Sequence, residues 1–173
     1  MENLLIVESP NKAKTIRQWL PKDKWNVFAS NGHIKNLPKK QYSISLENNK
    51  VNAKWEILPE KKKLIEQLRE LISNSSKVYI GTDDDREGER IALDLIEHFK
   101  IKDYYRVLFH EITKENIVDS LKNGLYIDNN RTNSQKARRV IDRIIGYPIT
   151  RAIRDKLKKE KVATDEELNG FGI

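Results

Sequence analysis

Short apolar runs alternate along the first 128 residues with segments whose apolar side chains recur every three or four positions. The runs predict buried strands, and the periodic segments predict helices with one apolar face. We expect strands at 3–8, 25–30, 78–81 and 106–109. We expect one helix at 11–20 and a second that begins at 59. We expect a third helix after the strand at 78–81, which ends at about 100, and a fourth at 113–123. This alternation indicates an α/β domain in which helices flank a mostly parallel four-stranded sheet.

The last third of the chain has the pattern of basic amphipathic helices. Between 133 and 147, one apolar stripe at helical spacing is surrounded by polar and charged positions. The stripe consists of Ala137, Val140, Ile141, Ile144 and Ile145. Pro148 predicts a break and a second basic helix from there to about 161, because proline cannot donate a helical hydrogen bond. Residues 162–173 lack periodicity and are expected to form a frayed tail. Two short runs, 43–46 and 51–57, are predicted to pair as a hairpin.

Charge follows the same division. The 173 residues carry a net charge of +7, and 131–161 alone carries +8, with eleven Lys or Arg and three Asp or Glu. The rest of the chain therefore has a net charge of −1. A nucleic acid is the usual partner of such a segment, although a solvated, lysine-rich helix surface has the same composition.

Composition disfavours several classes of protein. No run of about 18 apolar residues predicts a membrane-spanning helix, and the N-terminus lacks the pattern of a signal peptide. The absence of cysteine excludes a disulfide framework and a thiolate zinc site. These patterns fit a protein of the reducing cytoplasm without a membrane partner.

The densest acidic cluster follows the expected strand at 78–81. Five carboxylates occupy the seven positions 83–89, and Asp83, Asp85 and Glu87 are spaced two apart. Carboxylate oxygens at this spacing suit Mg²⁺, which binds one or two carboxylates together with water and substrate phosphate. Acidic residues are also favourable at the start of a helix, so part of the cluster could serve only as a cap.

Glu8 closes the first expected strand and is therefore predicted to lie at the same edge of the sheet as the acidic cluster. It could act there as a general acid or base, or it could form a simple ion pair with Lys12, four residues on. His33 follows Asn31-Gly32 after the second strand. A lone histidine is compatible with a structural, a surface or a functional role.

Five blocks in this order resemble the N-terminal part of the type IA DNA topoisomerases, including their Toprim domain. The blocks are LIVESPNKAKTI at 5–16, ASNGHIKNLP at 29–38, TDDDREGE at 82–89, FHEIT at 109–113 and ARRVIDRIIGY at 137–147. The resemblance implies a Rossmann-like Toprim domain at 1–128. It also implies a basic helical segment at 129–161 that begins the next topoisomerase domain. Residues 162–173 have no counterpart among these blocks, and we expect them to form a disordered tail.

The resemblance also implies an activity and a role for each matching residue. Members of this family relax negatively supercoiled DNA by transient single-strand cleavage and religation. Glu8 is expected to protonate the leaving deoxyribose oxygen, and Lys12 to position the scissile phosphate. Asp83, Asp85 and Glu87 are expected to hold Mg²⁺. The expected contacts to single-stranded DNA are His33, Gln135, Arg138, Arg139 and Arg143.

One element of the family is missing from this chain. None of its six tyrosines lies in the motif that carries the family's nucleophile. We therefore expect an excised or truncated Toprim part that is inactive alone. The remaining domains of the full-length enzyme, which is expected to be a monomer, would supply that tyrosine. The acidic triplet is also found in Mg²⁺-dependent Toprim nucleases and primases, and the basic segment alone is compatible with a non-catalytic nucleic-acid-binding module.

Overall fold

The computed structural model describes residues 2–38, 41–48, 50–109, 111–122, 124–125, 127–160 and 164. Except for Thr164, the tail predicted at 162–173 lies outside the described residues. The chain divides into two compact units, one comprising Met1–Asn36 and Ile57–Gln135 and the other Leu37–Glu56 and Lys136–Ile173. The division at 128 and 161 expected from the sequence stays a prediction.

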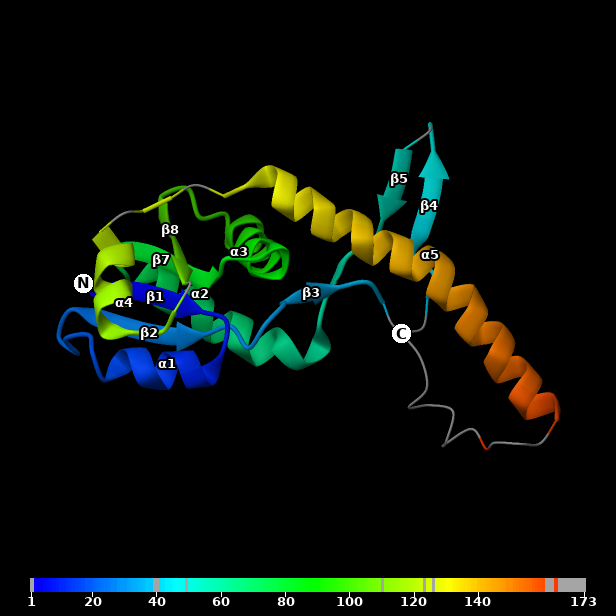
Figure 1. Ribbon diagram of the computed structural model, residues 1–173, viewed down its shortest axis with the longest axis horizontal. Helices are drawn as coiled ribbons and strands as arrows, with labels where there is room; N and C mark the ends of the chain where they lie inside the picture. The colour runs from blue at the N-terminus through cyan, green and yellow to red at the C-terminus, as the bar shows by residue number, and fades with distance from the viewer. Residues whose placement is uncertain are drawn as a thin grey trace. The chain divides into compact units, whose positions relative to one another are not determined.

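A four-stranded parallel sheet forms the centre of the first unit (Figure 1). Its strands are β1 (Asn3–Val7), β2 (Trp25–Ala29), β7 (Lys77–Asp83) and β8 (Tyr104–Phe109), in the order β2-β1-β7-β8. All three pairings are parallel, which confirms the predicted fold class. Val7 is opposite both Ala29 and Gly81, so the carboxyl ends of β2, β1 and β7 meet at one edge.

Helices cover both faces of this sheet. They are α1 (Pro10–Arg17), α2 (Lys62–Ser73) after a 3₁₀ turn at Pro59–Lys61, α3 (Arg86–Phe99) and α4 (Lys114–Lys122). Since side chains alternate along a strand, Leu4 and Ile6 pack with α2 and α3, whereas Leu5 and Val7 pack with α1 and α4. Burial on both faces is the reason why β1 is a continuous apolar run.

The starts of α1 and α3 place residues at the sheet edge. Ser9 caps α1 through a 3.2 Å hydrogen bond from Lys12 N, and Pro10 occupies the first helical position. This is the helix start that Ser-Pro predicts. Asp85 caps α3 in the same way by accepting a 2.6 Å hydrogen bond from Gly88 N. Both helices therefore begin within a few residues of a strand end.

The second unit contains the predicted hairpin. Its strands are β4 (Ile44–Glu47) and β5 (Lys50–Ala53), which pair in antiparallel register, so the second strand is shorter than expected. Asn48 in the turn has a φ of 51°, a left-handed conformation that asparagine tolerates. The short strands β3 (Lys35–Asn36) and β6 (Glu56–Ile57) lie where the chain crosses between the units.

The break predicted at Pro148 is wrong. A single helix, α5 (Asn129–Lys159), continues through this proline. Proline removes one backbone hydrogen bond, the one to the carbonyl of Ile144, and this residue lies on the exposed side of the helix, 39% exposed. The apolar stripe is also exposed in the described residues, with Ile141 at 53% and Ile145 at 57%.

Candidate functional site

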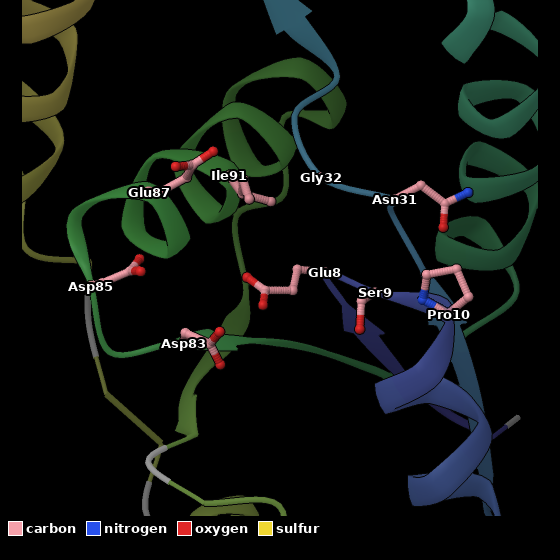
Figure 2. A pocket seen from close by; sticks show the side chains of 9 residues that line it. All are labelled: Glu8, Ser9, Pro10, Asn31, Gly32, Asp83, Asp85, Glu87 and Ile91. Carbon is pink, nitrogen blue, oxygen red and sulfur yellow. The ribbon is translucent and has the colours of Figure 1, made fainter.

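A cavity of about 490 Å³ opens at the carboxyl edge of the sheet (Figure 2). Glu8 reaches it from the end of β1, Asp83 from the end of β7, and Asp85 and Glu87 from the start of α3. The tertiary structure thus places four of the sequence-predicted carboxylates around one space. Asn31 and Gly32, after β2, line its other side.

Lys12 links the two carboxylates at the strand ends. Its Nζ donates to Glu8 Oε1 and, at 2.5 Å, to Asp83 Oδ1. The local ion pair between Glu8 and Lys12, which the sequence left as one alternative, is therefore present. The same ammonium group also binds a carboxylate 71 residues away. The pair is part of the acidic cavity, so the two alternatives for Glu8 are compatible.

The pKa values of Glu8 and Asp83 are shifted in opposite directions. Burial raises the pKa of Glu8, and a hydrogen bond with Asp83 raises it further, while Lys12 opposes both effects. Burial also favours the neutral form of Asp83, but the hydrogen bonds from Glu8 and Lys12 lower the pKa of this carboxyl below its ordinary value. The two carboxyl groups therefore have pKa values that are moved apart, and Glu8 keeps its proton to a higher pH than Asp83 does.

The turn from β7 into α3 is too tight for a side chain at position 88. A Cβ on Gly88 would lie 2.4 Å from the Asp83 carbonyl oxygen and 2.6 Å from Thr82 Oγ1. Close approach of the helix start to the strand end keeps Asp83 and Asp85 on the same side of the turn. Asp85 serves as the helix cap and lines the cavity, which reconciles the two interpretations of the acidic cluster.

His33 lies beside the acidic cavity. Asn31 and Gly32 both have positive φ, 56° and 82°, and this left-handed turn leads to His33. Its Nε2 is 3.1 Å from Glu87 Oε1, and its Nδ1 is 3.8 Å from Asp94 Oδ2. Asp94 is buried and paired with Arg90 at 2.7 Å. His33 thus supports the orientation of Glu87, a contact that the sequence did not suggest.

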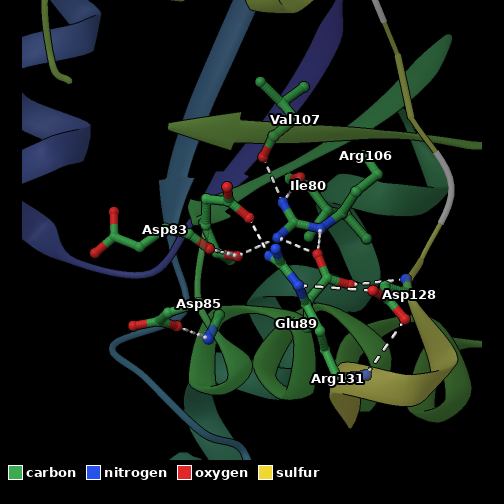
Figure 3. Close-up of polar contacts among 11 residues, drawn as sticks. Ile80, Asp83, Asp85, Glu89, Arg106, Val107, Asp128 and Arg131 are labelled. Carbon is green, nitrogen blue, oxygen red and sulfur yellow. Dashed lines mark hydrogen bonds and ion pairs between the residues drawn. The ribbon is translucent and has the colours of Figure 1, made fainter. Parts of the chain in front are cut away.

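A buried arginine lies beneath the acidic turn (Figure 3). Arg106 of β8 is fully buried, and its Nε donates to Glu89 Oε1 at 3.0 Å. Its Nη2 donates to Thr82 Oγ1 at 2.6 Å, and its Nη1 donates to the carbonyl oxygens of Ile80, at 3.1 Å, and Val107. Sequence reasoning missed this residue. The available signal was a charged side chain within an otherwise apolar strand of a sheet covered on both faces.

Glu89 extends this network to the start of α5. Its Oε2 accepts a 3.1 Å hydrogen bond from Asp128 N, and Asp128 Oδ1 accepts from Asn130 N at 2.8 Å. Arg131, in the first turn of α5, binds Asp84. Asp84 and Glu89, the two carboxylates of the acidic cluster outside the Asp83, Asp85 and Glu87 triplet, therefore connect the acidic turn to α5.

The residues predicted to contact DNA differ in their surroundings. Gln135 is 8% exposed and Arg143 is 5% exposed, whereas Arg138 is exposed, 4.0 Å from Asp142. The Arg143 Nη1 donates to the carbonyls of Pro38, at 2.6 Å, and Gln41, at 2.9 Å. Arg139 is half-buried. Arg139 and Arg143, both expected to contact DNA, thus have separate environments.

The donor set of the cavity suits a hard divalent cation, although its geometry is not that of a finished metal site. All candidate ligands are carboxylate oxygens, which Mg²⁺ prefers. One oxygen of each is already bound, Asp83 to Lys12, Asp85 to Gly88 N and Glu87 to His33. Within the described residues, no three potential ligand side chains are close enough together to bind one ion.

Comparison with known proteins identifies relatives of this chain. Residues 3–112 match the Toprim domain, a family whose members bind a divalent metal ion. The chain is 38% identical over 160 residues to DNA topoisomerase 1 of Campylobacter jejuni, covering 91% of this chain and 23% of the relative. It is 39% identical over 161 residues to DNA topoisomerase 1 of Helicobacter pylori strain 26695, covering 92% of this chain and 22% of the relative.

A solved structure is similar as well. Full-length topoisomerase I from Thermotoga maritima superposes with a TM-score of 0.76 at 37% identity, covering 85% of this chain and 25% of that one. The chain thus spans roughly a quarter of the length of these relatives. No helix in the described part of the chain has the length and apolar character needed to cross a membrane.

Proposed function

Since the chain belongs to the Toprim domain family, we propose that it is the Toprim part of a type IA DNA topoisomerase, which relaxes negatively supercoiled DNA by transient single-strand cleavage and religation. The observation that carries this proposal is the convergence of Glu8, Lys12 and Asp83 at one sheet edge. A carboxyl group with a raised pKa, a cation and a carboxyl group with a lowered pKa are in contact there.

Each of these groups has a role in the proposed reaction. The raised pKa of Glu8 favours the protonated form, which can donate its proton to the leaving deoxyribose oxygen. Lys12 lies between the two carboxylates and can bind a phosphate oxygen as a point charge. Two carboxylates whose pKa values are moved apart can take the separate roles of acid and ligand.

Asp83, Asp85 and Glu87 are the proposed holders of Mg²⁺. When bound, the ion would neutralise phosphate charge during religation. Asp83 and Glu87 would then exchange their contacts to Lys12 and His33 for a share in the metal site. Once the Lys12 ammonium group no longer contacts Asp83, it can bind the phosphate. Lys12 would therefore have a binding partner both without and with the metal ion.

The exposed stripe of α5 supports a partner within the same enzyme. Ile141, Ile145 and Ile149 are each more than half exposed, although the sequence pattern is that of a buried helix face. We propose that the remaining domains of the full-length enzyme, which include the nucleophilic tyrosine, cover this stripe. We further propose that the enzyme is a cytoplasmic monomer.

Replacing Arg139 or Arg143 by alanine is expected to have different consequences. Arg139→Ala should weaken binding of a single-stranded oligonucleotide and reduce the slope of log affinity against log salt by about 0.7, the value for one phosphate that is no longer neutralised. Arg143→Ala should act mainly on folding, because the carbonyls of Pro38 and Gln41 lose their donor. Anisotropy titrations at several salt concentrations and thermal unfolding of both variants measure the two effects. An unchanged salt slope for Arg139→Ala would remove this residue from the interface.

A chimera tests the proposed function. This chain would replace the matched 160 residues of Campylobacter jejuni DNA topoisomerase 1. We expect the chimera to relax negatively supercoiled plasmid in the presence of Mg²⁺, whereas this chain alone relaxes nothing and forms no covalent DNA adduct. Asp83→Asn in the chimera should abolish relaxation.

The alternatives predict other outcomes. Mg²⁺-dependent nicking or primer synthesis by this chain alone, lost in Asp83→Asn, would show a self-sufficient nuclease or primase. DNA binding by the chain together with an inactive but folded chimera would favour a non-catalytic binding module.

A further inference from the structure

A second cavity, of about 480 Å³, adjoins the acidic one. It lies along β2, the edge strand of the sheet, between α1 and the start of α2. Pro10 and Asn31 line both cavities, which therefore meet at these two residues. A chain-like ligand whose phosphate enters the acidic cavity can therefore continue into this second space.

The charge of the second cavity is opposite to that of the first. Arg17, Lys61 and Lys63 line it together with one carboxylate, that of Glu60. Lys61 Nζ donates to the carbonyls of Ser30, at 3.2 Å, and Asn31, at 2.5 Å. This ammonium group holds the turn at which the two cavities meet, while Arg17 and Lys63 are exposed at the rim.

The floor of this cavity is apolar and partly aromatic. Phe28, Ala13 and Leu64 line it, and the amides of Asn31 and Gln67 are the neutral polar groups around them. A surface that binds single-stranded nucleic acid combines two features. Cations bind the phosphate backbone, and an aromatic side chain beside them stacks on a base. A volume near 480 Å³ lies within the range of cavities that enclose a small ligand, which suits one nucleotide.

A peptide strand is the competing occupant of a sheet edge, and the structure disfavours it. Arg17 donates to the Val27 carbonyl through Nε at 3.0 Å and Nη2 at 2.6 Å. A strand added to β2 would need this acceptor for its own hydrogen bonds. An arginine that covers an edge carbonyl protects the edge against pairing.

We propose that the second cavity binds the nucleotide that adjoins the phosphate in the acidic cavity, on the same DNA single strand. Lys63 and the Nη1 group of Arg17, whose Nε and Nη2 stay on the Val27 carbonyl, contact its phosphates, and the base packs on Phe28. This inference rests on the proposed function, because it requires that a single strand reaches the acidic cavity.

Salt-dependent binding of single-stranded oligothymidylate by this chain tests the proposal. The variant is Arg17→Ala with Lys63→Ala, which leaves Lys61 and its turn intact. The control is Lys22→Ala with Lys24→Ala, which removes the same charge from exposed positions before β2. We expect roughly tenfold weaker binding for the first variant, with a salt slope reduced by about 0.7 for each phosphate that is no longer neutralised, and a smaller change for the control.

A photo-cross-link locates the base. Oligonucleotides that carry 5-iododeoxyuridine should cross-link to the peptide that contains Phe28. Equal losses in both double variants, or cross-links only to other peptides, would overturn the proposal. Free dTMP can instead compete for the cavity. If dTMP displaced the oligonucleotide at a concentration equal to the oligonucleotide's dissociation constant, the cavity would be a mononucleotide site and the proposal would be overturned. If the wild-type chain binds no single strand at all, this proposal is overturned, whereas the proposed function is decided separately by relaxation of plasmid in the chimera.

Discussion

Glu8→Gln in the Campylobacter chimera should lower the rate of plasmid relaxation by about 10²- to 10⁴-fold, the usual contribution of a positioned general acid. Glutamine has nearly the same shape as glutamic acid but has no proton to give to the leaving oxygen. The affinity for single-stranded DNA should stay within a few fold of that of the parent, because the cations remain. Relaxation time courses and anisotropy titrations measure the two quantities.

A matched control is Glu66→Gln, which changes an exposed glutamate of α2 outside the cavity. It should relax DNA at the parental rate. A Glu8→Gln chimera that retains a rate within threefold of the parent would remove Glu8 from the role of acid.

The pH dependence gives a second readout of the same residue. The folded-state pKa of Glu8 is raised, first by burial and then by its hydrogen bond with Asp83, so the carboxyl keeps its proton to a higher pH than an ordinary glutamate. The parental cleavage rate should therefore be highest below this raised pKa and fall as the pH rises through it. The same limb of the profile should be absent in Glu8→Gln, because glutamine does not titrate.

Arg106→Met is expected to destabilise the first unit by about 3–5 kcal/mol, which is the usual cost of removing one partner from a buried ion pair. Glu89 is only 2% exposed and would be left as an uncompensated charge. The Thr82 hydroxyl and the Ile80 carbonyl would lose a donor as well. Since small domains have a total stability of about 5–15 kcal/mol, urea-induced unfolding should show a much lower midpoint.

Two further variants separate the pair from general sensitivity to substitution. Arg86→Met removes an exposed arginine of α3 and should change stability by less than about 0.5 kcal/mol. The double variant Arg106→Met with Glu89→Met removes both charges and should recover part of the loss, because no buried charge is left unpaired. A midpoint for Arg106→Met equal to that of the wild type would show that the network contributes nothing to folding.

Local sequence signals were sufficient for most of the first unit. The apolar run of β1 and the helix that follows it were predicted, because each depends on residues that are neighbours along the chain. The parallel sheet was predicted from the alternation of strands and helices. The common edge of Glu8 and Asp83 also followed from sequence, since parallel strands end on one side of a sheet. The assignment of a role to each residue came from the resemblance to topoisomerases.

The sequence by itself therefore determined the fold class, the helix starts and the edge of the sheet at which the carboxylates meet. Only the tertiary structure decided that Lys12 joins Glu8 to Asp83, that Arg106 binds Glu89 and that the Arg143 guanidinium is occupied by backbone carbonyls. It also decided that α5 continues through Pro148. The physical reason is the distance along the chain over which each kind of interaction acts. Periodicity and caps act over a few residues, whereas the contacts of a long charged side chain and the exposure of a helix face depend on segments far apart in the chain.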